Sequence, residues 1–340
     1  MKFDTKILPP KAENIMLSGE YIRNGEVVGF PTETVYGLAA NAFDEDAVSK
    51  IFIAKGRPQD NPLIVHISDI NMLDKLTKDV SPTARKLAEK FWAGALTIIL
   101  PKSENVSDVV TAGLKTVAVR FPDHEVAIKM IQSAGVPLAA PSANISGSPS
   151  PTTAKHVLSD MSGKIPIIVD GGSCEVGLES TVVAVDDDKI TILRPGKITM
   201  DDLLMVTENV TLDASVLAEL SDSETAISPG QKYKHYSPKA KVVIVEGDLE
   251  NFKTYMEKNK TAGTFGLVFS GDEEVVPIEC VTYGAETDSE QNGRLLFDAL
   301  RKLDEKGAKI VLARPPRQDG VGLAVYNRLL RSAGFEIVKA

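Results

Sequence analysis

Cysteine and net positive charge are both scarce in this chain. Its 340 residues include two cysteines, Cys174 and Cys280, and carry a formal net charge of −9 at pH 7. The cysteines are far apart and lack metal-ligand spacing, so we expect free thiols in a reducing cytoplasm. The negative net charge argues against a protein whose main task is to bind nucleic acid, but it does not exclude a local basic pocket.

Long apolar runs and the common nucleotide fingerprints are missing too. No run reaches the ~18 residues that span a membrane. The opening residues MKFDTKILPP lack the apolar core of a signal peptide, so we expect no membrane contact. The chain contains no G-x-x-x-x-G-K-[ST] loop, and residues 320–322 match a dinucleotide fingerprint poorly. Neither a catalytic cysteine nor a pair of catalytic carboxylates is evident.

What the chain does have is an alternation of short apolar runs and helix-like segments, over a length that suggests two domains of roughly 150 residues each. The strand-like runs are 27–30, 63–67, 97–100, 117–121, 137–140, 165–169, 181–185 and 190–193. Helical patterns cover 13–24, 45–55, 81–91, 125–134 and 153–160. Residues 186–190 are typical of a hairpin turn. This mixture predicts an α/β domain with a twisted mixed sheet.

The composition changes after residue 196. Residues 197–220 favour an acidic helix, and 221–241 have the Ser, Pro and Lys content of a linker. The linker also interleaves cations with aromatic residues: Lys232, Tyr233, Lys234, His235 and Tyr236. Such a group suits stacking on a base and pairing with phosphate. A solvated hinge is the alternative, and composition alone leaves both open.

The last hundred residues predict a second, smaller domain. Strand-like runs at 242–245, 265–269 and 309–313 alternate with helical patterns at 291–305 and 322–333. That order favours a doubly wound, Rossmann-like parallel sheet. We therefore expect a first domain over 1–206, a linker or lid over 207–240, and an α/β domain over 241–340.

Polar groups follow several of the predicted strands. Thr32 and Thr34 come after the first apolar run, where they could meet a ligand or only bond their own turn. Lys55 and Arg57 flank Gly56 in a proline-stiffened loop; they suit phosphate, or form an exposed basic turn.

Two further charged or titratable groups lie in strand-like runs. Alternation places Leu63, Val65 and Ile67 on one face and His66 on the other; a lone His of this kind is more often a core residue than a ligand contact. Arg120 ends its run, where it could receive a carboxylate or pair with a nearby acid.

The stretch 139-AAPSANISGSPSPT-152 is the most informative. Hydroxyls and an amide follow an apolar run, and prolines restrict the loop, so it can bind phosphate oxygens. Ser180 and Arg194 also sit at strand edges. Strand ends of an open α/β sheet gather around one crevice. Cations, hydroxyls and amides there suit a nucleoside triphosphate and a small zwitterion.

These stretches resemble the threonylcarbamoyl-AMP synthase family, whose first domain is YrdC-like, in its long two-domain form. The matching stretches are PTETVYGL, KGRPQDNPLIVHI, FWAGALTIIL, VAVRFPDH, PLAAPSANISGSPSPT, GLESTVV, ILRPGKI and SPGQKYKHYSPKA, which span residues ~20–240. One stretch departs from the family, which usually has prolines where this chain has Ala93 and Ala95. No residue role carried over here depends on that loop.

The resemblance implies a reaction. The amino group of L-threonine takes up bicarbonate or CO2, the carbamate attacks the α-phosphate of ATP, and threonylcarbamoyl-AMP and pyrophosphate form. It also implies Mg2+ held mainly by the ATP phosphates, with no protein metal site. A downstream tRNA threonylcarbamoyl transferase would use the product to modify tRNA.

The resemblance also implies residue roles. The catalytic pairs are Lys55 with Arg57, and Ser142 with Asn144. The threonine site is Thr34, His66, Arg120, Ala140 and Ser180. The ATP site is Arg57, Asn61, Thr116, Ser142, Ser150, Arg194 and Tyr236.

Two rival functions stay open on the sequence. A carbamoyl transferase of the hydrogenase-maturation type shares a YrdC-like domain but adds zinc-finger cysteines, of which this chain has too few. A YrdC-like binder of double-stranded RNA is disfavoured by the net charge for the whole chain. A weak local RNA contact remains open.

The role of Arg57 is testable by Arg57→Ala. Loss of one charged phosphate contact should weaken the interaction with ATP by about 1.5–3 kcal/mol. Calorimetric titration with ATP, together with turnover, measures the change. Unchanged ATP affinity and turnover in the variant would contradict the assignment.

Overall fold

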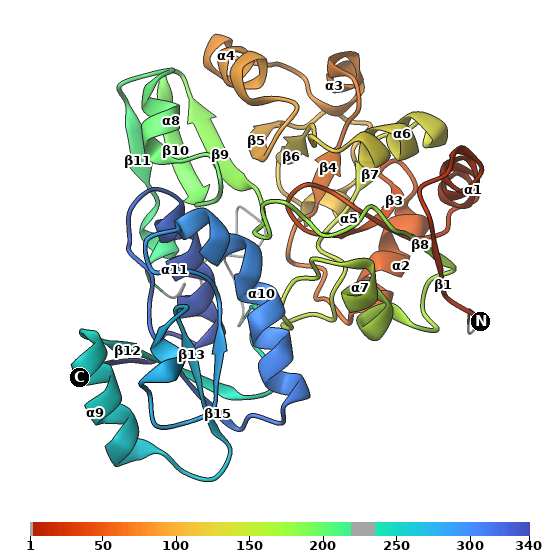
Figure 1. Cartoon of the computed structure of the whole chain (residues 1–340). Coiled ribbons are helices and arrows are strands. Elements are labelled where there is room, and N and C mark those ends of the chain that lie inside the picture. The colour runs from red at the N-terminus through yellow and green to blue at the C-terminus, as the bar shows by residue number, and fades with distance from the viewer. Residues whose placement is uncertain (1–2, 219–234) are drawn as a thin grey trace.

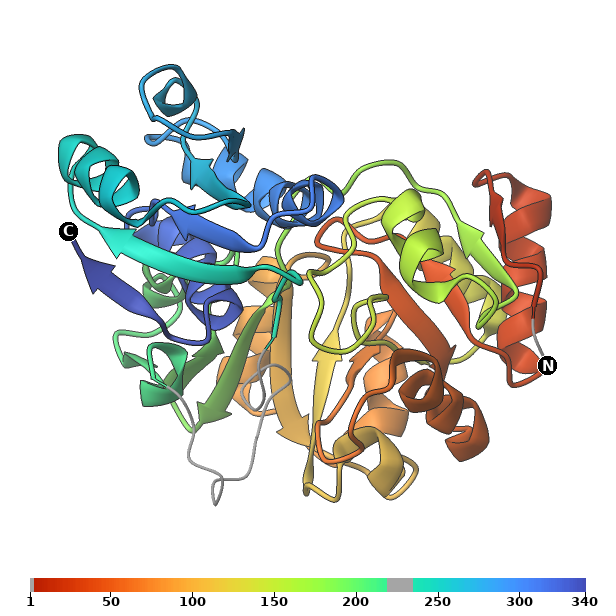
Figure 2. The ribbon, with the colours of Figure 1, turned by 90° about the horizontal axis from the view of Figure 1, so that it is seen from below.

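The computed structural model describes residues 3–218 and 235–340 and shows two α/β parts lying side by side (Figures 1 and 2). The N-terminal part is coloured red to green and the C-terminal part blue in Figure 1. The α/β class, the mixed sheet and the smaller second parallel sheet that we predicted are confirmed.

Within the described residues, the first sheet has eleven strands of mixed direction. In spatial order they are β1 (Lys6–Leu8), β8 (Ile167–Val169), β2 (Val28–Phe30), β3 (Gly37–Asn41), β7 (Leu138–Ala139), β4 (Ile64–His66), β6 (Thr116–Arg120), β5 (Leu96–Pro101), β9 (Thr181–Asp186), β10 (Lys189–Arg194) and β11 (Val210–Leu212). The parallel register of β4 and β6 sets His66 opposite Arg120. Two predicted site residues are therefore neighbours because of backbone pairing alone.

Helices cover the first sheet. They are α1 (Ala12–Arg23), α2 (Glu45–Lys55), α3 (Leu73–Leu76), α4 (Pro82–Phe91), α5 (Asp108–Thr111), α6 (Glu125–Ala134), α7 (Ala154–Met161) and α8 (Met200–Leu204), with 3-10 turns at Ile70–Met72 and Ala214–Val216. Helix α2 matters most for the site. Asp44 caps its first turn by accepting from the Ala47 N–H at 3.0 Å, and Gly56 ends it with a left-handed φ of 62°. Lys55 and Arg57 thus flank a fixed turn.

The second sheet has five parallel strands among the described residues. Their order is β14 (Cys280–Thr282), β13 (Thr264–Val268), β15 (Ile310–Ala313), β12 (Lys241–Glu246) and β16 (Ile337–Lys339). Helix α9 (Leu249–Asn259) packs on the face that carries Val243 and Val245. Helices α10 (Ser289–Glu305) and α11 (Gly320–Ser332) pack on the face of Val242 and Ile244. A 3-10 turn covers Asp272–Glu274. Helices on both faces make this sheet doubly wound.

Local patterns located most elements but not all. The hairpin at 186–190 and the helix at 45–55 are confirmed, as are the free cysteines. The predicted acidic helix over 197–220 is wrong: α8 is short, and β11 pairs with β10 instead. Sheet pairing overrides the local helical preference there. Strand β3 was missed because its Gly and Ala residues have low strand propensity.

The predicted domain limits at 206 and 240 stay predictions. The proposed lid over 207–240 lies largely outside the described residues, since 219–234 are not described. Lys232, Tyr233 and Lys234 fall in that gap. His235 and Tyr236 lie just after it and are described.

Packing of α1 on α6 predicts the effect of Gly19→Ala. A Cβ at Gly19 would stand 2.6 Å from the carbonyl carbon of Ser133, which belongs to backbone and cannot yield easily. We expect a loss of about 1–3 kcal/mol in unfolding free energy, measured by urea denaturation. Glu20→Ala, at an exposed position of the same helix, is the control. A stability gain of about 1 kcal/mol in Gly19→Ala, as helix propensity alone would give, would refute this packing.

Candidate active site

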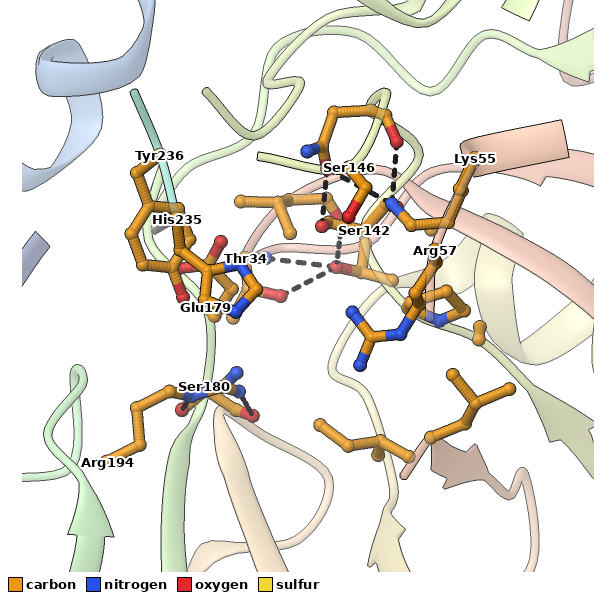
Figure 3. Close-up of a pocket in the computed structure, with 18 of the residues that line it drawn as sticks. Thr34, Lys55, Arg57, Ser142, Ser146, Glu179, Ser180, Arg194, His235 and Tyr236 are labelled. Carbon is orange, nitrogen blue, oxygen red and sulfur yellow. Dashed lines mark hydrogen bonds between the residues drawn. The ribbon is translucent and has the colours of Figure 1, made fainter. Parts of the chain in front are cut away.

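A cavity open to solvent, with about 740 Å³ of empty space that includes open solvent, lies at strand ends of the first sheet, beside His66, Arg120 and Ala140. Eleven predicted site residues line it: Thr34, Lys55, Arg57, His66, Arg120, Ala140, Ser142, Asn144, Ser180, Arg194 and Tyr236. Figure 3 shows Lys55 and Arg57 on one side and His235 and Tyr236 on the other.

Three predicted residues do not line the cavity. Asn61 is buried behind it, and its carbonyl accepts from Arg57 at 3.3 Å. Ser150 lies behind the wall and donates to Glu179. Thr116 begins β6, whereas Arg120 ends the same strand at the cavity. Asn61 and Ser150 therefore support the lining, while Thr116 lies at the far end of its strand.

The Lys55 ammonium ties α2 to the loop after β7. It is 2% exposed and donates to the carbonyls of Ser142 at 2.5 Å and Asn144 at 2.6 Å. The Ser142 hydroxyl donates to Asn144 Oδ1 at 2.5 Å. Burial, and then the nearby Arg57 charge, lower the pKa of Lys55. An incoming anion would oppose both effects, so this corner favours phosphate.

Arg57 projects from the turn that ends α2. Its guanidinium donates to the carbonyls of Asn61 and Pro62, at 3.3 and 3.2 Å. Its backbone N–H donates to Phe52 O at 3.0 Å. These bonds hold the side chain along the cavity wall, where a planar fork can meet phosphate oxygens.

Arg120 is held by groups from two other segments. It donates through Nη1 to Thr34 Oγ1 at 2.8 Å and through Nε to the Gly94 carbonyl at 3.2 Å. Its Nη2 lies 2.6 Å from the buried carboxylate of Glu33, a close ion pair without hydrogen-bond alignment. The 92–95 loop, for which we predicted no role in the site, therefore supports Arg120 through the Gly94 carbonyl. Thr34 Oγ1 also contacts the Thr32 hydroxyl at 2.8 Å.

His66 is 4% exposed and lies edge-on to Phe30, with ring centroids 5.5 Å apart. Burial, and then the charge of Arg120, lower its pKa to about 3. The imidazole is therefore neutral at physiological pH and can offer a hydrogen bond without adding a positive charge. As predicted, Leu63, Val65 and Ile67 face the core and His66 faces the cavity.

Ser180 and Arg194 close the far side of the cavity. Arg194 donates through Nε to the Ser180 carbonyl at 3.0 Å and through Nη2 to its hydroxyl at 3.1 Å. Thr97 lies 2.8 Å from the same hydroxyl. Burial and the neighbouring Arg328 and Arg120 lower the pKa of Arg194. Arg194 is thus a further buried cation, and a bound anion would stabilise its charged form.

The segment that follows the undescribed residues docks against the cavity. Tyr236 is buried, with its ring 5.3 Å from that of Phe297 in α10. The N–H of Ser237 donates to Gly147 O at 2.8 Å. This docking supports the nucleotide-contact interpretation of Tyr236 over a solvated hinge.

The sequence missed two buried acids beside these cations. Glu179 lines the cavity and pairs with Arg328 of α11 at 2.9 Å. Glu33 pairs with Arg120. Both acids stand within motifs already singled out, next to Ser180 and Thr34, but their partners are remote in sequence. In the sequence, the one sign of their role was that each acid stands next to a hydroxyl residue of a motif.

Two family models together match most of the chain. A family model described as "Telomere recombination" matches residues 20–196. A second, described as "Threonylcarbamoyl-AMP synthase, C-terminal domain", matches residues 198–334. The chain belongs to the threonylcarbamoyl-AMP synthase family. The family and the two-part form that we predicted are confirmed.

Individual relatives agree over nearly the whole chain. The threonylcarbamoyl-AMP synthase of Pyrococcus abyssi is 46% identical over 96% of this chain and 95% of its own. That of Bacillus subtilis is 46% identical over 94% and 92%. A crystal structure of P. abyssi Sua5 complexed with L-threonine matches with a TM-score of 0.91 and 42% identity, covering 99% of each chain. As a member of this family, the protein is an enzyme that uses ATP to form an adenylate.

Two features are absent from residues 3–218 and 235–340. No helix among them has the length and apolar character needed to cross a bilayer. No group of three or more His, Cys, Asp or Glu side chains in the same ranges could hold a metal ion.

The lowered pKa of His66 predicts how stability varies with pH. Its folded pKa of about 3 lies below the ordinary 6.5, so its stabilising contribution is complete above pH 6.5 and is lost as pH falls toward 3. The loss should be on the order of 1 kcal/mol per pH unit within that window. Urea unfolding from pH 7 to 4 measures it, with His66→Gln flattening the curve. A His66 imidazole that NMR finds protonated at pH 6 would contradict this.

Proposed function

We propose that the cavity binds L-threonine and ATP side by side and joins them, through carbon dioxide, into threonylcarbamoyl-AMP. The single observation that carries this proposal is the arrangement of the lining. Lys55 and Arg57 lie on one wall (Figure 3), and Arg120 and the neutral His66 also line the cavity. One cavity therefore offers cations for a triphosphate together with a cation and a neutral ring for a zwitterion.

The threonine half comprises Thr34, His66, Arg120, the backbone of Ala140, and Ser180. Arg120 supplies the cation that a carboxylate needs, and Glu33 limits the net charge there. The neutral His66 ring and the Thr34 and Ser180 hydroxyls offer directional bonds for an amine and a hydroxyl. This balance of charge suits a small zwitterion better than a polyanion.

The ATP half comprises Arg57, Asn61, Thr116, Ser142, Ser150, Arg194 and Tyr236, as the family resemblance implies. Arg57, Arg194 and Lys55 would meet the phosphates, while Tyr236 would contact the nucleotide from the opposite side of the cavity (Figure 3). The lining supports most of this set directly. Asn61 and Ser150 would act from behind it by holding Arg57 and Glu179. For Thr116, at the far end of β6, the resemblance is the only support.

The chemistry follows from positioning and charge. An oxygen of the threonine carbamate attacks the α-phosphorus of ATP, a P–O bond forms, and the bond to pyrophosphate breaks. The nucleophile belongs to the substrate, so the protein need not provide one. Lys55 and Arg57 would neutralise the charge that develops on the departing pyrophosphate. The hydrogen bond from the Ser142 hydroxyl to Asn144 Oδ1, 2.5 Å long, would hold the loop between β7 and α7 in place.

Mg2+ would enter with the nucleotide. Among the described residues that line the cavity, Glu179 is the one acid, and Arg328 already pairs with it. Such a donor set fits an ion coordinated mainly by phosphate oxygens and water rather than by a protein cage. When bound, the ion would neutralise phosphate charge and help to orient the triphosphate.

The product defines the next step. A mixed anhydride of a carbamate and a phosphate is reactive, so a transferase that passes the threonylcarbamoyl group to tRNA must consume it. We place both steps in the cytoplasm. Because the net charge is −9, the proposal includes only a weak and local contact with RNA.

The test is a reconstituted reaction. Purified protein with L-threonine, bicarbonate, Mg2+ and α-labelled ATP should form a labelled adduct and pyrophosphate, which chromatography resolves from AMP. Omitting threonine or Mg2+ should abolish both products. A folded sample that makes neither product would overturn the proposed function. Pyrophosphate release without threonine would instead point to ATP hydrolysis.

A further inference from the structure

Arg328 is a buried cation of the second part that reaches the cavity wall of the first. It lies in α11 and is 0% exposed. Its Nε donates to Glu179 Oε2 at 2.9 Å and its Nη1 to the Pro195 carbonyl at 2.9 Å. Its Nη2 donates to the Glu179 carbonyl at 3.3 Å. One guanidinium thus holds two segments of the first part, on either side of the β9–β10 hairpin.

Through Glu179, Arg328 is also linked to the loop between β7 and α7, which carries Ser142, Asn144 and Ser150. The other carboxylate oxygen of Glu179 accepts from the Ser150 hydroxyl. Burial alone would raise the pKa of Glu179, but Arg328, Arg194 and the Ser150 bond outweigh it, and the pKa is lowered. Glu179 is therefore ionised, and both of its oxygens are occupied by groups that it orients.

Arg328 also contacts the aromatic wall. Its guanidinium carbon lies 5.6 Å from the centroid of the Tyr236 ring, within cation–π range. Tyr236 packs on Phe297 of α10 on another side. The ring that faces the nucleotide half is therefore held by two helices of the second part, with Arg328 as the charged contact.

Further bonds from α11 hold the chain on both sides of the undescribed segment. Asn327 Nδ2 donates to Val216 O at 2.6 Å, and Arg331 Nη2 donates to Ser215 O at 2.8 Å. The Ser237 hydroxyl donates to Ser332 O at 3.0 Å. Helix α11 is thus fixed against the first part at several points, and Arg328 is the one that touches the cavity lining.

We propose that Arg328 is a positioning residue for the ATP half of the cavity, by which the second part of the molecule completes the active site. It sets the Glu179 carboxylate, and through it Ser150, and it fixes the Tyr236 ring for the nucleotide. It touches none of the threonine-half side chains in the contacts above. This inference rests on the proposed function, because it assumes that ATP occupies that half.

Arg328→Lys, which keeps the charge but loses the fork, tests the proposal. We expect the Kd of a non-hydrolysable ATP analogue to rise at least ~10-fold and the Kd of L-threonine to stay within about twofold. Calorimetry measures both on the full chain. The matched control is Arg314→Lys, since Arg314 is also buried and pairs with Asp272 at 2.6 Å in the same part. That control should lose stability without a selective loss of ATP affinity.

A purely structural role would give a different result. If folded Arg328→Lys binds both ligands like wild type, or loses affinity for both equally, the proposal is overturned. Should Arg328→Lys not fold, Arg328→Met combined with Glu179→Gln removes both charges together and leaves neither buried alone. The double variant should bind the analogue more weakly than Glu179→Gln alone, because it also lacks the cation–π contact of Arg328 with the Tyr236 ring. Equal affinities would overturn the proposal.

The wild-type measurements separate this inference from the proposed function. Wild-type protein that binds the ATP analogue and forms the adduct supports the function, so a negative Arg328 result then counts against the inference alone. Wild-type protein that binds neither ATP nor threonine contradicts the function, and the inference falls with it.

Discussion

The contact of the Lys55 ammonium with the carbonyls of Ser142 and Asn144 is the interaction on which the site depends. It joins the end of α2 to the loop after β7, across 87 residues of sequence. Removing the ammonium would leave two inward-facing carbonyls without their donor, at a cost of about 1–3 kcal/mol each. The same contact keeps a cation in place beside Arg57 before any ligand arrives. The cavity is thus preorganised for an anion by bonds that also hold its walls together.

Charge in the cavity is balanced locally, not by the protein as a whole. Arg120 and Arg328 each pair with one buried acid, and Lys55 and Arg57 donate to backbone carbonyls. Lys55 and Arg57 lie together on one wall of the cavity (Figure 3), in a chain whose net charge is −9. In the function proposed above, this wall is the triphosphate side of the cavity. Such a local grouping also explains why composition alone could argue only against a broad basic surface.

Short-range patterns predicted much of the fold and a large share of the lining. The capped helix α2 and the β9–β10 hairpin have strong local signals, so both were located closely. Strand β11 was missed because its pairing partner, not its own residues, determines its structure. The pairing of Glu179 with Arg328 joins positions 149 apart. No local sequence pattern specifies such a contact. The contribution of the second part of the molecule to the cavity wall could therefore be inferred only from the structure.

A crystal structure with L-threonine, bicarbonate and an ATP analogue whose α,β-bond resists cleavage would test the proposed active site most directly. We expect the α-phosphorus beside Lys55 and Arg57, with the reacting atoms about 3–3.5 Å apart. Threonine would lie against Arg120 and His66, and the adenine or ribose against Tyr236. A nucleotide found instead at the strand ends of the second sheet, or threonine outside the cavity, would contradict the proposed active site.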